Sequence, residues 1–182
     1  MKDVVLLTGA GQIGMAIARR IGYGKKTVVA DKKCENAAKI AEILANAGFD
    51  VEAVTMDLSS RESILSCIAT AQRFGDIVHL VNAAGVSPSQ ASIETILAVD
   101  LYGTAVLLEE VGKVIRHGGS GVTISSQSGW RLPALTPEED AALATTPTEG
   151  LLSLPLLDPA VIHDTLHAYQ LAKRCNAKRV MG

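Results

Sequence analysis

Tyr169 and Lys173 stand four positions apart in a stretch whose pattern predicts a helix. Residues at this spacing lie one above the other on one face of an α-helix, so both side chains are expected to point the same way. On a helical wheel the apolar residues Ile162, Leu166 and Val180 share that side, which predicts that the pair faces inward. A phenol is a poor base at neutral pH, and a nearby ammonium group favours its ionised form. Together the two side chains could pass a proton to or from a substrate oxygen.

A second chemical pattern lies near the start of the chain. The residues Gly9-Ala10-Gly11-Gln12-Ile13-Gly14 form a G-x-G-x-x-G motif, with a predicted strand ending at Thr8 and an amphipathic helix beginning directly afterwards. Glycines permit a tight turn and a close approach of the backbone to a pyrophosphate, and the start of a helix offers it free N–H groups and a positive dipole. In this context the motif predicts a dinucleotide site, with an ordinary glycine-rich turn as the alternative.

Asp31 ends the next predicted strand, at about the offset where an acidic side chain accepts hydrogen bonds from the adenosine ribose hydroxyls. A carboxylate at this place also repels a 2′-phosphate, which favours NAD over NADP. Two features leave other interpretations open: Lys32 and Lys33 follow directly and could accommodate the phosphate, and Asp31 could instead only cap a turn or helix.

The elements that position these residues are short β-branched runs alternating with helical patterns. The predicted strands are 4–8, 27–31, 51–56, 77–81 and 121–125, and the predicted helices are 12–21, 35–47, 60–74 and about 92–116. A capping box of Ser59 and Glu62 is expected to open the third helix. Continuously apolar strands joined by helices indicate right-handed crossovers and a sheet covered on both faces. The predicted fold class is α/β, a doubly wound, Rossmann-like parallel sheet in three α/β/α layers, forming one domain over residues 1–182.

The stretch from about 131 to 159 interrupts this alternation, because it holds five of the six prolines and no strand pattern. Thr136 and Thr146 each precede a proline and, three positions on, a glutamate, which predicts two short capped helices. Asp158-Pro159 repeats the signal and predicts the start of a last helix that runs to about Arg179. We therefore expect a proline-rich helical insertion that borders the substrate and acts as a flap.

In the order and placement of its motifs the chain resembles the short-chain dehydrogenase/reductase family over nearly its whole length. The resemblance rests on the glycine motif, on Asp57-Leu58, on Asn82-Ala83-Ala84-Gly85, on Ser125-Ser126-Gln127-Ser128-Gly129 and on Tyr169-x-x-x-Lys173. Each of the middle three follows a predicted strand, as in the family.

The resemblance implies a nicotinamide cofactor, NAD with NADP not excluded, and a role for individual residues. It implies that Tyr169 is the acid or base, that Lys173 assists it and reaches the nicotinamide ribose, and that Ser126 donates a hydrogen bond to the substrate oxygen. Cofactor contacts are implied for Gly9, Gly11, Gln12, Ile13, Gly14, Asp31, Asp57, Leu58, Asn82, Ala83, Gly85, Tyr169 and Lys173.

The sequence also departs from the family pattern. Asp100 stands where the family usually has an asparagine that organises a proton path to the lysine. We keep Asp100 among the predicted catalytic residues, with two interpretations open: it pairs with Lys173, or it only bends its helix by bonding the backbone. The glycine motif is one residue shorter than both common family forms.

The chain stops at Gly182, before the last strands that the family usually has. This leaves the fifth predicted strand, with Val122 and Ile124, as an edge that invites pairing with another chain. A shortened chain, a fragment and a chain completed by a partner are all open interpretations, and we expect a homo-oligomer.

Composition narrows the classes of function. The net charge of -2 offers no basic field for nucleic acid or an anionic membrane, and no apolar run is long enough for a membrane span or a signal peptide. The widely spaced Cys34, Cys67 and Cys175 contain no C-x-x-C pair and fit a reducing, cytoplasmic location. His163 and His167 stand four apart without a recognisable third ligand, so no metal site is predicted.

These observations predict an oxidoreductase that interconverts a small alcohol and a carbonyl compound by hydride transfer. Two alternatives stay open. One is a nucleotide-binding module without turnover. The other is a sugar-nucleotide epimerase or dehydratase, which would need a second substrate domain that these residues do not supply.

Overall fold

The computed structural model describes residues 2–181 of the chain. The chain forms two compact units, one from Met1–Ala84 and Leu107–Ile124, the other from Gly85–Val106 and Ser125–Gly182. The polypeptide therefore passes from the first unit to the second twice. The organisation of residues 1–182 as one domain stays a prediction.

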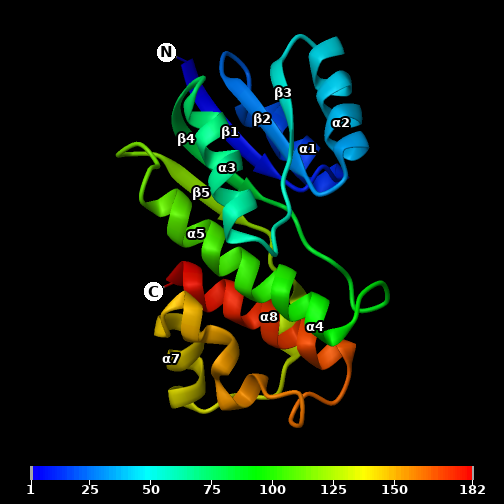
Figure 1. Cartoon of the computed structure of the whole chain (residues 1–182), viewed down its shortest axis with the longest axis vertical. Helices are drawn as coiled ribbons and strands as arrows, with labels where there is room; N and C mark the ends of the chain where they lie inside the picture. The colour runs from blue at the N-terminus through cyan, green and yellow to red at the C-terminus, as the bar shows by residue number, and fades with distance from the viewer. Residues whose placement is uncertain (1, 182) are drawn as a thin grey trace. The chain divides into compact units, whose positions relative to one another are not determined.

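The first unit contains one parallel sheet. Its strands are β1 (Lys2–Thr8), β2 (Lys26–Asp31), β3 (Asp50–Thr55), β4 (Gly75–Asn82) and β5 (Ser120–Thr123), in the order β3-β2-β1-β4-β5 (Figure 1). The strand order reverses beside β1, so the crevice that α/β folds use for ligands lies at the carboxyl ends of β1 and β4. The predicted doubly wound α/β fold is confirmed.

Burial agrees with the positions of β1 and β5 in the sheet. Val4, Val5, Leu6 and Leu7 are fully buried, which places β1 in the middle of the sheet with both faces covered. Strand β5 is short and lies at one end of the sheet, and its residue Val122 is 42% exposed. It is therefore an edge strand, as the sequence predicted.

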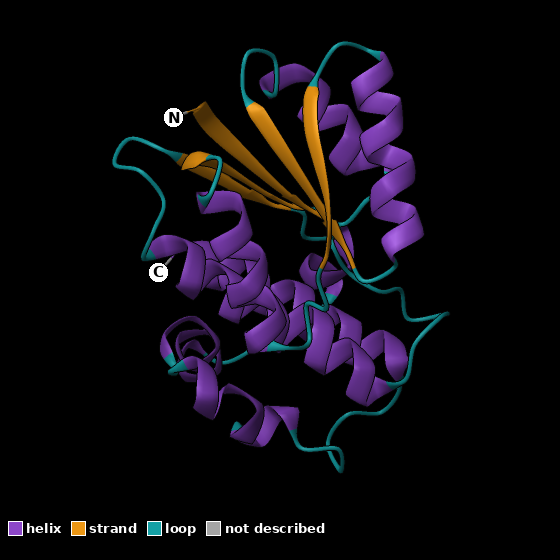
Figure 2. Ribbon diagram, turned by 45° about the horizontal axis from the view of Figure 1, so that its top comes forward, coloured by secondary structure: helices purple, strands orange, loops and turns teal. Residues whose placement is uncertain are grey.

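Helices cover both faces of this sheet (Figure 2). On one face α1 (Gln12–Ile21) and α2 (Cys34–Asn46) bury Ala18 and Leu44 in a core that includes Leu7 and Val29. On the other face α3 (Arg61–Gln72) packs against β1 and β4. Arg61 of α3 forms ion pairs with Glu109 and Glu110 of α5 (Thr104–Gly112), whose second half belongs to this unit.

The start of α3 differs from the prediction. Ser60, not Ser59, caps the helix, because its Oγ accepts a hydrogen bond from the Ser63 amide at 3.2 Å. The Ser59 hydroxyl is instead bound to the Asp57 carboxylate at 2.6 Å, so the predicted capping box with Glu62 is wrong.

The second unit is helical. Its elements are α4 (Ile93–Ile96), a π-helical segment η1 (Leu97–Gly103), the start of α5, α6 (Gln127–Arg131), α7 (Pro137–Thr145), two 3₁₀ segments η2 (Thr148–Ser153) and η3 (Pro155–Leu157), and α8 (Thr165–Met181). The single helix predicted over about 92–116 is therefore three consecutive segments with a π-helical middle.

The proline-rich stretch is part of this unit's core. Leu143, Leu151 and Leu157 are at most 2% exposed and share one apolar cluster with Leu101 and Leu171. The segment therefore contributes to the core of the second unit, and its role as a flap that borders the substrate stays a prediction. Figure 1 shows α7 lying against α8.

The helix starts in this stretch follow the prediction in part. Thr136 and Glu139 form the expected capping box of α7, with hydrogen bonds of 3.2 and 2.8 Å. The segment after Thr146 is 3₁₀ and has no side-chain cap. The signal at Asp158 produces only a turn, and α8 begins seven positions later at Thr165.

The predicted inward face of α8 is confirmed for Lys173, which is 5% exposed, but it is wrong for two of the apolar residues assigned to it. Leu166 and Val180 are 47% and 58% exposed, whereas Leu171 and Cys175 are buried. Helix α8 packs against α4, η1 and α7 of the same unit. Within residues 2–181 the structure contains no helix that is both long and apolar enough to cross a bilayer.

Candidate functional site

The first unit brings the glycine motif to the carboxyl end of β1. Gly9 has φ +86°, and a Cβ there would lie 2.4 Å from the Ala84 nitrogen and 2.5 Å from the Ala83 carbonyl carbon, so only glycine fits. A Cβ at Gly14 would lie 2.7 Å from Leu7 Cδ1. The tight turn and the close packing of α1 on β1 therefore depend on these two glycines.

Gly11 plays a different part, because a Cβ at this position would meet nothing within 4 Å. It is the N-cap of α1, with no side-chain hydrogen bond to the helix and no acidic residue in the first turn. Gln12 and Ile13 are exposed beside it. The start of α1 thus offers N–H groups and the positive end of the helix dipole to an anion.

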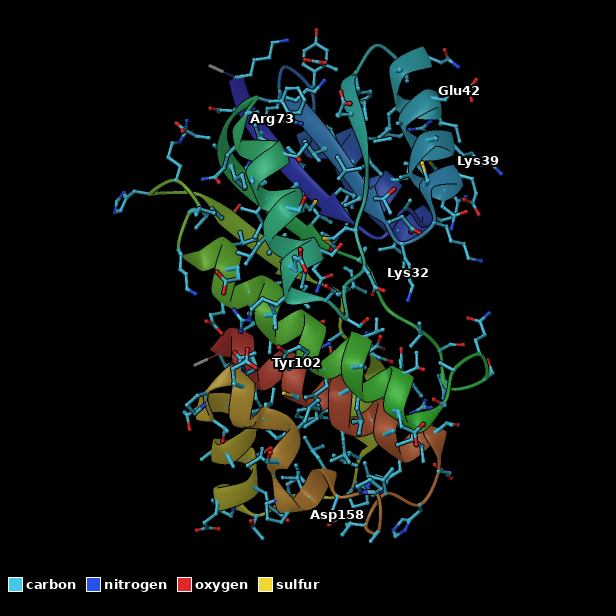
Figure 3. The ribbon with its side chains drawn as sticks, in the orientation of Figure 1. Lys32, Lys39, Glu42, Arg73, Tyr102 and Asp158 are labelled. Carbon is cyan, nitrogen blue, oxygen red and sulfur yellow. The ribbon has the colours of Figure 1, made fainter. Side chains whose placement is uncertain are left out.

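Asp31 ties the end of β2 to the glycine motif. Its Oδ2 accepts a hydrogen bond from the Ala10 amide and its Oδ1 accepts one from the Lys33 amide, both at 2.9 Å. Lys32 extends from the carboxyl end of β2 (Figure 3) and its Nζ lies 2.8 Å from Asp57 Oδ2.

Asp57 and Asn82 complete this end of the sheet. Burial acts to raise the pKa of Asp57, but hydrogen bonds from Lys32 and Ser59 outweigh it and hold that pKa below its ordinary value. Asn82 is 1% exposed, and its Oδ1 accepts hydrogen bonds from the Thr8 hydroxyl at 2.8 Å and the Ala84 amide at 3.3 Å. Its side chain thus fixes the ends of β1 and β4.

Most of the predicted cofactor residues are brought together by the first unit. They are Gly9, Gly11, Gln12, Ile13, Gly14, Asp31, Asp57, Asn82 and Ala83, all at the carboxyl end of the sheet. Leu58 is also there, but its side chain is only 4% exposed, so it can offer chiefly backbone atoms. Gly85, Tyr169 and Lys173 belong to the second unit.

The reactive pair lies on α8. The Lys173 Nζ is 5.3 Å from the centre of the Tyr169 ring, within cation–π distance. Lys173 is 5% exposed, whereas Tyr169 is only partly buried. The tyrosine therefore remains within reach of a small molecule.

The loop that carries Ser126 is fastened to α8. The Ser125 hydroxyl donates a hydrogen bond to the Lys173 carbonyl at 2.7 Å. A Cβ at Gly129 would lie 2.7 Å from the Arg174 backbone nitrogen, so this glycine lets α6 approach the backbone of α8 next to Lys173. Sequence reasoning assigned no role to Ser125 or Gly129, although the S-S-x-x-G motif contained both.

Ser126 itself is the N-cap of α6, and its Oγ accepts a hydrogen bond from the Ser128 amide at 3.1 Å. Accepting this bond leaves the hydroxyl proton to be donated elsewhere. A pocket of about 370 Å³ adjoins these residues. It is lined by Ser125, Ser126, Gly129, Trp130, Lys173, Arg174, Ala177, Lys178 and Met181.

Asp100 pairs with Lys173. The carboxylate is fully buried in η1, with Oδ2 3.3 Å from Lys173 Nζ and Oδ1 accepting a hydrogen bond from the Val86 amide at 2.8 Å. A Cβ at Gly85 would lie only 3.1 Å from Asp100 Oδ1 and 3.2 Å from Lys173 Nζ, so a glycine accommodates the pair. Burial raises the pKa of the Asp100 carboxyl, against the charge of Lys173 and the Val86 hydrogen bond.

The remaining candidate groups form no such site. The His163 and His167 rings stack with centroids 4.9 Å apart. Across residues 2–181 the structure gathers no cluster of three or more potential metal ligands. Burial raises the pKa of the Cys67 and Cys175 thiols to about 12, and Cys34 is exposed at the start of α2.

Comparisons with known proteins agree with this arrangement. Residues 3–136 match the family model for short chain dehydrogenases. The chain is 38% identical over 180 residues to the short-chain dehydrogenase/reductase bsc3 of Alternaria brassicicola, an alignment that covers 98% of this chain and 65% of that protein. It is 30% identical over 138 residues to levodione reductase of Leifsonia aquatica, covering 69% of this chain and 52% of that protein. The chain therefore spans about two thirds or less of the length of these relatives.

Two solved structures share the fold. A short-chain dehydrogenase/reductase from Burkholderia phymatum in complex with NAD superposes with a TM-score of 0.64 at 24% identity, over 75% of this chain and 52% of that one. The actinorhodin polyketide ketoreductase with NADPH superposes with a TM-score of 0.63 at 28% identity, over 71% and 55%. With the sheet order, the glycine turn and the Tyr169–Lys173 pair already described, these matches place the chain in the short-chain dehydrogenase/reductase family.

Proposed function

We propose that this chain binds a nicotinamide dinucleotide through its first unit and serves an enzyme that interconverts a small carbonyl compound and an alcohol. The observation that carries the proposal is the pairing of Tyr169 with a buried lysine on α8, 5.3 Å from ring centre to Nζ. Family membership supports an oxidoreductase, and the residues of both units have the chemistry that such a reaction needs.

The first unit has the features that a dinucleotide requires. The turn at Gly9 leaves no room for a side chain, and the space at Gly11 is open in front of the uncapped start of α1. This arrangement suits a pyrophosphate. Gly11, Gln12 and Ile13 would hold the phosphates, Asp31 the adenosine ribose, and Asp57 with the Leu58 backbone the adenine.

The chemistry that a bound nicotinamide dinucleotide would supply is the gain or loss of a hydride. Tyr169 exchanges a proton with the substrate oxygen, giving it up in reduction and taking it in oxidation. Ser126 donates a hydrogen bond to the same oxygen and stabilises the charge that develops there. Lys173 would favour the phenolate by its charge, and its ammonium hydrogens would be donors to the nicotinamide ribose.

We further propose a preference for NAD. In this proposal the Asp31 carboxylate would repel a 2′-phosphate. Lys32, one of the two neighbouring cations, is paired with Asp57 at 2.8 Å. The relatives include a complex with NAD and one with NADPH, so family membership alone leaves the choice open.

The test is calorimetric titration of NAD and NADP into the whole chain, followed by consumption of reduced cofactor with a panel of small ketones and aldehydes. Gly9→Ala is expected to abolish dinucleotide binding because its Cβ would overlap the backbone of Ala83 and Ala84. Gly112→Ala is the matched control, since a Cβ there meets nothing within 4 Å. Binding without turnover across the panel would instead support a nucleotide-binding module, and no binding of either dinucleotide would contradict the proposal.

A further inference from the structure

Asp100 is the residue at which this chain changes the charge of the site. In the family pattern an asparagine usually stands here, and this chain replaces a neutral amide with an acid. The carboxylate is 0% exposed and lies 3.3 Å from the Nζ of Lys173, which is itself 5% exposed. A buried ion pair at this distance interacts much more strongly than one in water, because the local dielectric constant is low.

The pair has a direct consequence for Tyr169. Lys173 favours the phenolate because its positive charge lies beside the ring. A carboxylate paired with the same ammonium group offsets part of that charge. With Asp100 ionised, the net field at the phenol is therefore weaker than Lys173 alone would produce.

On the basis of the proposed function, we infer that Asp100 is a positioning residue that holds Lys173 and offsets its charge, so that Tyr169 keeps its proton at neutral pH and acts as an acid. In this direction the carbonyl carbon gains a hydride from the reduced dinucleotide and the carbonyl oxygen takes the phenol proton of Tyr169. The phenolate that remains is protonated again from solvent. The site is thus adapted to carbonyl reduction near neutral pH rather than to alcohol oxidation.

Other charged groups on the packed elements are engaged elsewhere. The π-helical segment η1 packs against α4, α8 and η2. Glu94 of α4 is exposed, and Glu149 of η2 accepts a hydrogen bond from Tyr102 (labelled in Figure 3) at 3.1 Å. On α8, Arg174 and Lys178 both pair with Asp140. Arg179 donates hydrogen bonds to the carbonyls of Ala144 and Thr146. The ring of His167 stacks on that of His163. Within residues 2–181 the ion pair of Asp100 is therefore with Lys173.

The inference is tested on the whole chain by NMR, without cofactor or substrate. The three tyrosines are labelled with ¹³C at Cζ, and the signal of Tyr169 is identified by its loss in Tyr169→Phe. Asp100→Asn should lower the pH at which this signal titrates by about one to two pH units, because the charge of Lys173 is no longer offset. Circular dichroism over the same pH range shows that each variant is folded.

Asp140→Asn is the matched control, because it also removes one negative charge that forms ion pairs with α8. The Asp140 carboxylate lies 2.8 Å from both Arg174 and Lys178 of that helix. It should leave the titration of Tyr169 nearly unchanged. A folded Asp100→Asn chain in which Tyr169 titrates as in the wild type, or at higher pH, would overturn the inference and leave Asp100 with a purely structural role.

A second measurement needs no variant at Asp100. Labelling the aspartates with ¹³C at Cγ should show Asp100 as a carboxylate at pH 7, with its signal assigned through the backbone. A protonated Asp100 at that pH would also overturn the inference, since a neutral acid offsets no charge. Because both measurements are made without cofactor, they distinguish a failure of this inference from a failure of the proposed function, which would show as absent dinucleotide binding.

Discussion

The carboxylate of Asp31 accepts a hydrogen bond from the Ala10 amide at 2.9 Å, so the end of β2 is fastened to the middle of the glycine motif. The residue proposed to select the cofactor therefore also shapes the turn that would hold its phosphates. Selectivity and affinity for the dinucleotide should change together when this side chain is altered.

Asp31→Ala is expected to narrow the preference for NAD over NADP, because a carboxylate close to a 2′-phosphate costs about 1 to 3 kcal/mol when partly desolvated. It should also weaken NAD binding, since the hydrogen bond to Ala10 is lost. Calorimetric titration of both dinucleotides measures the two effects. If the wild-type chain binds NADP at least as tightly as NAD, Lys32 or Lys33 holds the phosphate and the assignment of Asp31 is wrong.

The proposed reaction makes distinct predictions for three side chains. Tyr169→Phe should abolish turnover with little change in NAD affinity, because the variant lacks only the phenol hydroxyl that exchanges the proton. Lys173→Ala should lower both turnover and NAD affinity. Ser126→Ala should lower turnover by about 10²-fold or more, as loss of one hydrogen-bond donor to a developing oxyanion does. Steady-state kinetics combined with NAD titration separates these cases, and an active Tyr169→Phe enzyme would contradict the proposed acid.

The packing of the proline-rich stretch is tested by two adjacent leucines. Leu151 is fully buried in the core of the second unit, whereas Leu152 is 42% exposed. Leu151→Ala should therefore lower the free energy of unfolding by about 2 to 5 kcal/mol, and Leu152→Ala should change it little. Urea denaturation followed by circular dichroism provides both values; equal effects would show that the segment does not belong to the core.

Thiol reactivity should differ sharply along the chain. Burial raises the pKa of Cys67 and Cys175 to about 12, so at pH 8 these thiols are almost entirely protonated and also shielded. Cys34 is exposed. Iodoacetamide at pH 8 is expected to modify Cys34 alone in the native chain and all three cysteines in urea, as mass spectrometry of the digested protein can show. Fast native labelling of Cys175 would mean that α8 opens readily.

The sheet was predictable from sequence because its signals are local. Runs such as Val4 to Leu7 are apolar at every position, and the glycines that follow them at Gly9 and Gly14 carry a steric requirement that any dinucleotide-binding turn shares. The positions of Asp31, Asp57 and Asn82 at the same end of the sheet follow from the parallel arrangement of the strands.

The second unit was predicted less well because its contacts are distant in sequence. The sequence left the pairing of Asp100 with Lys173 as one of two interpretations, and the structure shows that pair. No local pattern indicates that Leu143 and Leu151 share a core with Leu101. The apolar pattern placed Leu166 and Val180 on the inward face of α8, where the structure leaves both exposed, although it placed Lys173 there correctly. Lys173 is polar yet buried, because an ion pair lowers the cost of burying its charge.

The three crossings of the chain between the units have a consequence for biosynthesis. The core of the second unit joins Leu101, made before β5, to Leu171, which emerges from the ribosome after it. The apolar side chains of α4 and η1 therefore lack their packing partners while the final strand of the first unit and the proline-rich stretch are synthesised. During this interval the apolar side chains of α4 and η1 are exposed to aggregation.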